Sequence, residues 1–266
     1  MDRLKINDTL FKELSDNPPD WWKKLIKAKE INIQIRKDNS IEVYYKGGAI
    51  IRNLKWSSRN KGFTGNINYQ YIPFESERVY IPFIFDKSSV EFGKVNILRL
   101  DNFNNKSLKG IKSILDKFYG EYSEKTIQAN FIKNDPNFID SEFMYNPREH
   151  NMANLRIDLT RLDTKTKKIV FIEVKTIGDR RLFSNEIVEQ LKKYKDFIEK
   201  YGERLLGYYK KVFVIKKNLG ILPVGLQEEN IEKNKLMQKP LLLFGDCSQK
   251  WINDNSKSLD EKIRKH

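Results

Sequence analysis

Two charged residues interrupt an apolar segment near the middle of the chain. The segment reads KIVFIEVKTI (residues 168–177) and is rich in the β-branched residues typical of a buried strand. Because successive side chains of a strand point to opposite faces, Glu173 and Lys175 share one face and Val174 points to the other. A buried carboxylate and a buried ammonium destabilise a sheet unless other groups compensate them. The pattern therefore predicts a strand that carries a functional site.

A second carboxylate lies in the preceding apolar segment. The segment IDLTRL contains Asp158, and the turn DTKTKK lets the two segments pair as an antiparallel hairpin. With the tip of the hairpin at residues 164–168, Asp158 lies near Glu173 across the ladder. Magnesium prefers oxygen ligands and is typically held by one or two carboxylates together with substrate phosphate. We therefore expect the two carboxylates to share a divalent metal ion.

The spacing of an acid and a lysine two residues later separates this segment from the rest of the chain. The spacing occurs three times, at Asp163–Lys165 in a turn, at Glu173–Lys175, and at Asp260–Lys262 in a polar tail. Only the second lies in a continuous apolar strand. A Gln-x-x-x-Tyr pair occurs once, at Gln190 and Tyr194, one helical turn apart on a shared face. We expect that helix to pack back over the same sheet.

In this order the motifs resemble the PD-(D/E)XK nuclease superfamily, in particular its RecB-like branch with the QxxxY helix. The resemblance covers roughly residues 107–220, and the residue before the aspartate is Ile157 rather than the proline of the motif's name. It implies a mixed α/β fold with a restriction-endonuclease-like αβββαβ core. The residues that carry it are, in chain order, Glu124 on a helix, Asp158, Glu173, Val174, Lys175, Gln190 and Tyr194.

The resemblance implies an enzyme that hydrolyses phosphodiester bonds with Mg²⁺, for which Mn²⁺ can substitute. Asp158 and Glu173 would be metal ligands, with the main-chain carbonyl of Val174 as a further ligand. Lys175 would orient the attacking water or stabilise charge at phosphorus. Glu124 would complete the site or reach a second metal ion, although a glutamate in a first helical turn also has a purely structural role. The glutamine and tyrosine of the QxxxY pair would position the lysine, the water or the phosphate.

We expect two domains in the chain: an N-terminal β-rich domain with short helices (residues 1–104) and a nuclease-like domain (residues 105–266). Periodicity and turn signals predict the first domain's elements. They are helices on either side of Pro18-Pro19 and strands at residues 41–45, 49–56, 67–74, 79–85 and 95–100, with a hairpin at Gly47-Gly48. In the second domain they predict a helix from residue 107 to Gly120 and a helix capped by Ser123. Beyond the central motifs they predict a strand at 211–221, a helix at 228–237, a short buried strand at 241–244 and a partly helical tail.

The net charge of +14 favours a polyanionic partner, and DNA is the favoured substrate. Basic and aromatic residues of the N-terminal strands are candidates for contacts with the backbone and bases of a nucleic acid. Alternatively, the aromatic residues form the core of their own sheet and the charged residues form its solvent-exposed face. The candidates are Lys46, Arg52, Lys55, Trp56, Arg59 and Lys61. The Trp21-Trp22 pair is read as a packing anchor.

The sequence lacks the residues that several other classes of protein require. The single cysteine, Cys247, forms no internal disulfide, and no segment approaches transmembrane length, so we expect a soluble cytoplasmic protein without membrane contact. With His150 and His266 as the only histidines, zinc sites and Ser-His-Asp triads lack parts, and no Walker A motif is present.

Two alternatives to a nuclease are left open. One is a catalytically inactive nucleic-acid or protein-binding module, and the other is a protein whose central charges form a buried ion network. A homodimer or a partner protein is compatible with either. Arg148, Glu149 and Arg156 lie near the central motifs in sequence, and they could belong to the site or equally form ordinary ion pairs.

Overall fold

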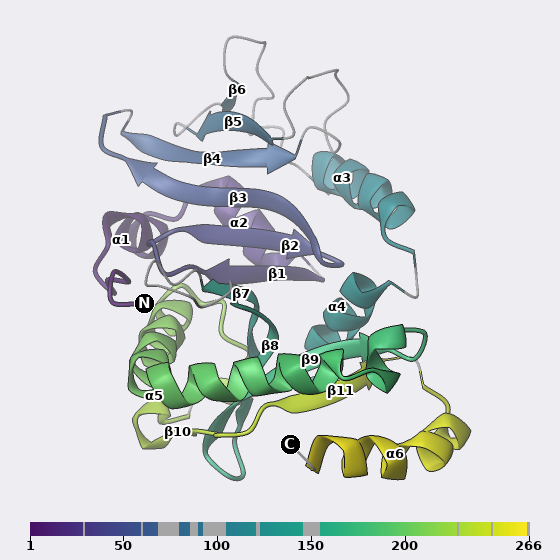
Figure 1. The fold of residues 1–266 in the computed structure, drawn as a ribbon. Coiled ribbons are helices and arrows are strands. Elements are labelled where there is room, and N and C mark those ends of the chain that lie inside the picture. The colour runs from purple at the N-terminus through teal and green to yellow at the C-terminus, as the bar shows by residue number, and fades with distance from the viewer. Residues whose placement is uncertain are drawn as a thin grey trace. The chain divides into compact units, whose positions relative to one another are not determined.

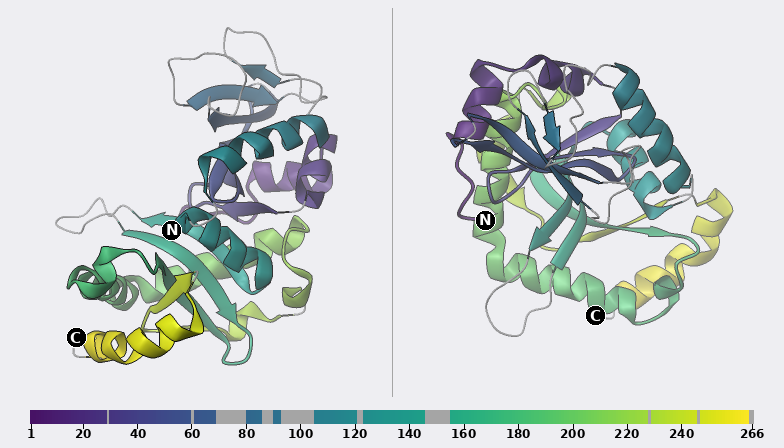
Figure 2. Two further views of the ribbon diagram at one scale, coloured as in Figure 1. Left: turned by 90° about the vertical axis from the view of Figure 1, so that its right-hand side faces the viewer. Right: turned by 90° about the horizontal axis from the view of Figure 1, so that it is seen from above.

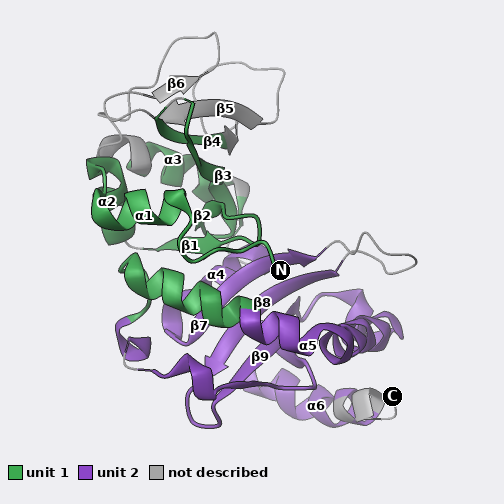
Figure 3. Ribbon diagram, turned by 90° about the vertical axis from the view of Figure 1, so that its left-hand side faces the viewer, with its two compact units in different colours: residues 1–120, 208–223 green, residues 121–207, 224–266 purple. Residues whose placement is uncertain are grey.

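The structure is a computed structural model, and it describes residues 1–28, 30–59, 61–68, 80–85, 90–92, 105–120, 123–145, 155–227, 229–245 and 247–264. The chain divides into two compact units (Figure 3). Unit 1 contains residues 1–120 and 208–223, and unit 2 contains residues 121–207 and 224–266. This division differs from the predicted boundary after residue 104. Helix α3 (Asn105–Phe118) and the last third of helix α5 (Glu186–Asn218), residues 208–218, belong to unit 1.

Unit 1 is built on an antiparallel sheet with the strand order β1-β2-β3-β4-β5-β6 (Figure 1). Helices α1 (Thr9–Asp16) and α2 (Asp20–Lys27) precede it and lie on either side of the two prolines, as predicted. Trp21 and Trp22 are buried, which confirms their reading as packing anchors. The strands are β1 (Ile31–Ile35), β2 (Ile41–Tyr45), β3 (Gly48–Ser57), β4 (Gly62–Asn68), β5 (Tyr80–Phe85) and β6 (Val90–Phe92).

The predicted hairpin at the two glycines joins β2 to β3. Tyr45 pairs with Gly48, and the two loop residues, Lys46 and Gly47, have φ angles of +46° and +78°. Two positive φ angles are the signature of the type I′ turn, whose twist matches that of the strands. A Cβ atom on Gly48 would lie 2.4 Å from Cδ2 of Leu115, so helix α3 packs directly on this end of the sheet.

Three of the candidate nucleic-acid contacts of unit 1 have partners within the unit. Trp56 packs edge to face on Phe63 with ring centroids 5.0 Å apart. Ion pairs join Lys46 to Asp116 at 2.7 Å and Lys55 to Asp38 at 2.6 Å. These contacts favour the reading in which the aromatics and charges serve the sheet itself. Most of the predicted strand at 67–74 and all of the one at 95–100 lie outside the described residues.

Unit 2 is a mixed α/β unit around a sheet with the strand order β10-β9-β8-β7, to which β11 adds by pairing with β9. Strands β7, β8 and β9 are antiparallel neighbours, and β10 and β11 run parallel to β9. The elements are α4 (Glu124–Asn134), β7 (Phe138–Tyr145), β8 (Leu155–Asp163), β9 (Lys168–Thr176), the 3₁₀ helix η3 (Arg180–Phe183), the first two thirds of α5 (residues 186–207), the 3₁₀ helices η4 (Val224–Leu226) and η5 (Ile231–Lys233), β10 (Lys235–Leu236), β11 (Leu241–Gly245) and α6 (Gln249–Arg264).

Helices α4 and α5 pack on the sheet of unit 2 (Figure 2). Ile127 of α4 packs into a core with the alternating β9 residues Val170, Ile172 and Val174. The approach is close, since a Cβ atom on Gly245 of β11 would lie 2.0 Å from Cγ2 of Ile127. The opposite side chains of β9, which include the glutamate and lysine of the central motif, are left to face α5.

Residues 211–221, predicted as a strand, are the end of helix α5 and the turn after it, so that prediction is wrong. The segment KVFVI is rich in β-branched residues, but the buried side chains recur at helical spacing, at Tyr208, Val212, Ile215 and Leu219. Within unit 1 the hydroxyl of Tyr208 donates to the carbonyl of Ile35 at 2.9 Å. Tertiary burial of this face outweighs the strand propensity of its residues.

Two further predictions need correction. The described part of the predicted helix at 228–237 forms only η5 and the two-residue strand β10. Residues 241–244 do form a strand, β11, but in the described part of the chain it pairs with β9 alone and leaves Leu241 45% exposed. It is therefore an edge strand rather than a buried one. The tail is helical as α6, and no helix in the described residues combines the length and apolarity needed to cross a membrane.

Candidate functional site

The β8–β9 hairpin places the two predicted carboxylates side by side. Its ladder runs from Asp163 paired with Lys168 to Leu159 paired with Ile172, and the next step of that register sets Asp158 opposite Glu173. Asp158 is 3% exposed, and Glu173 and Lys175 are each 1% exposed. Three ionisable groups are thus buried together at the end of this hairpin, where the pattern of the sequence predicts them.

Where the β8–β9 ladder ends, the side chain of Asp158 accepts a hydrogen bond from a main-chain N–H of β9. Its Oδ2 accepts the N–H of Val174 at 3.0 Å, and its Oδ1 lies 3.6 Å from Nη2 of Arg156. The contact to Val174 ties the end of β8 to β9 and fixes the orientation of the carboxylate. Oδ1 is left as the atom that faces the other charged groups.

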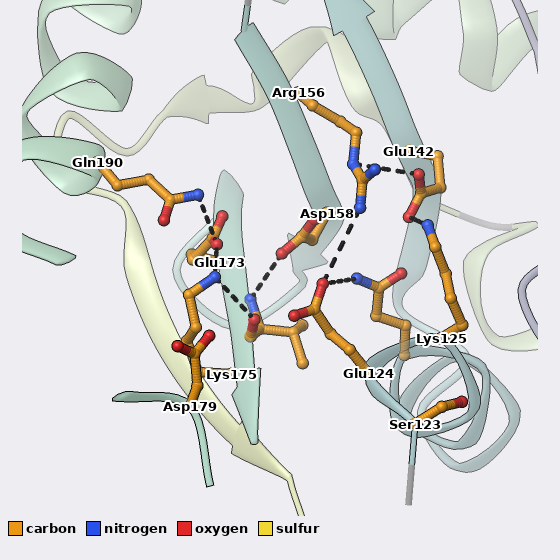
Figure 4. A network of polar contacts seen from close by, with 12 residues as sticks. Ser123, Glu124, Lys125, Glu142, Arg156, Asp158, Glu173, Lys175, Asp179 and Gln190 are labelled. Carbon is orange, nitrogen blue, oxygen red and sulfur yellow. Dashed lines mark hydrogen bonds and ion pairs between the residues drawn. The ribbon is translucent and has the colours of Figure 1, made fainter. Parts of the chain in front are cut away.

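Three of the predicted residues, Lys175, Gln190 and Tyr194, contact Glu173, and Figure 4 shows the first two beside it. Its Oε1 accepts from Nζ of Lys175 and from Nε2 of Gln190 at 2.6 Å, and its Oε2 lies 2.6 Å from the hydroxyl of Tyr194. Nζ of Lys175 also lies 3.4 Å from the carbonyl of Val174. The lysine of β9 and the QxxxY pair of α5 therefore meet on one carboxylate. Both oxygens of this carboxylate have protein hydrogen-bond partners.

The hydroxyl of Tyr194 lies between two acceptors, Glu173 and the main-chain carbonyl of Arg156. A hydroxyl has one proton, so it can donate fully to only one of them. Burial, and after it the charge of Asp158, raises the pKa of Glu173 to about 7. In its protonated form Glu173 donates to the oxygen of Tyr194 while Tyr194 donates to the carbonyl, which satisfies all three groups. Burial also raises the pKa of Tyr194, so the tyrosine stays a neutral donor.

Glu124 lies at the rim of the site and contacts two arginines. Ser123 caps helix α4 as predicted, with its Oγ accepting the N–H of Thr126 at 3.2 Å, and Glu124 follows in the first turn. Its Oε1 lies 3.9 Å from Nη2 of Arg156, and its Oε2 lies 4.0 Å from Nη2 of Arg181. Burial, and then the charge of Asp158, raises the pKa of Glu124.

A second layer of charges was not predicted from the sequence. Glu142 of β7 lies opposite Asp158, because the pairs on either side of it join Ser141 to Leu159 and Phe143 to Ile157. Its φ angle is +57°, and its carboxylate pairs with Lys125 and, at 3.2 Å, with Nε of Arg156. The signal that could have revealed it is the pair of acids, Asp140 and Glu142, within the strand segment FIDSEFMY.

Arg156 therefore bridges three carboxylates, those of Glu124, Glu142 and Asp158, which favours a place in the site over an ordinary ion pair, the two alternatives that the sequence left open. The two residues predicted alongside it, Arg148 and Glu149, lie outside the described residues.

The donors present match the chemistry of a hydrated Mg²⁺ ion. Two carboxylates, those of Asp158 and Glu173, and the carbonyl of Val174 are hard oxygen donors, and Mg²⁺ needs only one or two carboxylates beside water and phosphate. Within the described residues no three acids, histidines or cysteines lie close enough to hold an ion by themselves. Nζ of Lys175 contacts both Glu173 and the carbonyl of Val174, so this ammonium would have to withdraw from those oxygens to admit a metal.

Comparisons of the chain with protein-family models, with curated proteins and with solved structures gave no significant match. The case for a function therefore depends on the residues of the site.

Proposed function

We propose that the protein is a Mg²⁺-dependent nuclease that hydrolyses phosphodiester bonds, with DNA as its substrate. The observation that carries the proposal is the convergence of Lys175, Gln190 and Tyr194 on the buried carboxylate of Glu173. Such an arrangement is costly for stability, because several polar groups must be desolvated together. Buried groups with a strongly shifted pKa are concentrated at catalytic sites.

The element order of unit 2 supports the proposal. Helix α4, strands β7, β8 and β9, helix α5 and strand β11 follow one another as in the αβββαβ core that the sequence resemblance implies. The closing strand would be β11 in place of the strand predicted at 211–221. The net charge of +14 supports a polyanionic substrate, and a chain with one cysteine suits the reducing cytoplasm.

In this proposal Asp158, Glu173 and the carbonyl of Val174 would hold the metal, and Mn²⁺ would substitute for Mg²⁺. When bound, the ion acts as a Lewis acid and lowers the pKa of its water. Gln190 and Tyr194 hold the Glu173 carboxylate in one orientation through hydrogen bonds of 2.6 Å each. Lys175 places a positive charge beside the carboxylates, where it would stabilise the negative charge that develops on the phosphoryl group.

Cleavage of plasmid and of labelled oligonucleotides in Mg²⁺ and in EDTA tests the proposal. We expect Mg²⁺-dependent cutting by the wild type and a loss of about 100-fold or more in Glu173→Gln and Lys175→Ala. Lys165→Ala is the matched control. It removes the lysine of the acid-x-Lys triplet in the β8–β9 turn, where Asp163 accepts main-chain N–H groups and has a structural role. Wild-type protein that cuts neither DNA nor RNA, or site variants that cut as well as Lys165→Ala, would refute the proposal.

A second candidate is a nucleic-acid-binding module that does not cut. The contacts of Lys175 favour it, because the ammonium occupies two of the oxygens that a metal would need. Gel-shift assays in Ca²⁺ beside cleavage assays in Mg²⁺ separate the two candidates. Binding without cleavage, together with no thermal shift on adding Mg²⁺, supports the module.

A further inference from the structure

Two arginines from different elements converge on one carboxylate at the rim of the site. Arg156 extends from β8 and Arg181 from η3, and each points a terminal nitrogen at a different oxygen of Glu124. The distances are 3.9 Å and 4.0 Å, which are beyond hydrogen-bond length. Figure 4 shows the side chains of Arg156 and Glu124 pointing toward one another. Glu124 thus sits between two guanidinium groups without forming a close ion pair with either.

Each arginine also pairs with a second acid, Asp179 for Arg181 and Glu142 for Arg156, which fixes its orientation. Nε of Arg181 donates to Oδ1 of Asp179 at 2.9 Å, and its Nη2 reaches Oδ2 of the same residue at 2.5 Å. Nε of Arg156 pairs with Glu142 at 3.2 Å. The guanidinium groups are therefore oriented before any ligand arrives. About half of each side chain is exposed, 45% for Arg156 and 47% for Arg181, so both are accessible from solvent.

A phosphate group fits this position better than the carboxylate that occupies it. A guanidinium donates two parallel hydrogen bonds to a phosphate, and such charge-assisted bonds are short. Glu124 is anchored to helix α4 and reaches both arginines only at the outer limit of an ion pair, whereas a free phosphate can settle at hydrogen-bond distance from both.

We propose that Arg156 and Arg181 bind a backbone phosphate of the nucleic-acid substrate, and that the carboxylate of Glu124 occupies the position of this phosphate in the free protein. This inference rests on the proposed function. It places the bound phosphate next to the reaction centre, because Nη2 of Arg156 lies 3.6 Å from Oδ1 of Asp158. It also reassigns Glu124, which becomes a competitor of the substrate rather than a ligand of a metal.

Binding of a fluorescent DNA oligonucleotide in EDTA tests this inference by anisotropy, without any need for cleavage. Arg156→Gln and Arg181→Gln should each weaken binding about tenfold or more. Each should also lower the slope of log K against log salt by about 1. Glu124→Gln should tighten binding about threefold, because it removes the competing charge. In the double arginine variant the Glu124→Gln substitution should have no further effect.

Arg161→Gln is the matched control, since Arg161 lies on the same strand and pairs with Asp135 at 2.6 Å, away from the site. Thermal unfolding of each variant separates loss of binding from loss of fold. Arginine variants that bind like Arg161→Gln, or a Glu124→Gln variant that binds no better than wild type, would overturn the inference. A protein that shows the expected binding pattern but never cuts DNA would refute the nuclease proposal and leave the phosphate site standing.

Discussion

Replacing Glu173 with glutamine should remove a pH dependence from the stability of the metal-free protein. The pKa of Glu173 is raised to about 7 from an ordinary value of 4.5, first by burial and then by Asp158. Glutamine imitates the protonated carboxyl: its amide N–H can donate to Tyr194, and its oxygen can accept from Gln190. The variant therefore keeps the contacts of the neutral form and loses the ability to ionise.

The sign of the effect follows from the direction of the pKa shift. Because the pKa is higher in the folded state, the folded protein binds the proton more tightly than the unfolded chain does. The resulting stabilisation is complete below pH 4.5 and is lost as the pH rises through 7. The difference of about 2.5 between the two pKa values corresponds to about 3 kcal/mol.

Urea unfolding in EDTA at pH 5, 6, 7 and 8 measures the effect in both proteins. Titrating groups that do not interact with Glu173 cancel in the difference between wild type and Glu173→Gln. We expect the wild type to lose about 2–3 kcal/mol relative to the variant between pH 5 and pH 8. At pH 8, Mg²⁺ should restore stability to the wild type and have a smaller effect on the variant. A difference between the two proteins that stays constant from pH 5 to 8 would refute the reasoning, because Glu173 would then be ionised throughout by its contact with Lys175.

The remaining predictions concern packing and the tyrosine of the site. Gly245→Ala should destabilise the protein by about 1–3 kcal/mol, because its Cβ would lie 2.0 Å from Ile127. Gly202→Ala, within helix α5, should instead stabilise the protein by about 0.5–1 kcal/mol, because its Cβ would lie 3.7 Å from Cδ1 of Leu236, an ordinary van der Waals contact. Thermal unfolding that shifts both variants in one direction would contradict this account. Tyr194→Phe should cost about 1–3 kcal/mol, since it leaves the buried Glu173 and the main-chain carbonyl of Arg156 without their shared partner. In the proposed nuclease it should lower kcat with little change in KM, and unaltered stability and kinetics would show that the hydroxyl has no role.

The elements that local patterns specify were predictable from the sequence. The cap at Ser123, the glycine turn after Tyr45 and the β8–β9 hairpin each depend on residues a few positions apart. Their physical causes are equally local: a hydrogen bond to a helix end, a positive φ angle and the alternation of side chains in a strand. The nearness of Asp158 to Glu173 belongs with them, because a hairpin's register follows from its turn.

The tertiary structure alone decided what surrounds those carboxylates. Residues 211–221 have the composition of a strand, yet their burial within unit 1 makes them helical. The rim of the site depends on Glu142, Arg156 and Arg181, which come from three elements that local pattern does not connect. A charged side chain does not reveal its partner by its neighbours in sequence, since an ion pair depends on distance in space. The sequence therefore determined the centre of this site, and the packing of α4, β7 and η3 around it determined which charges face a ligand.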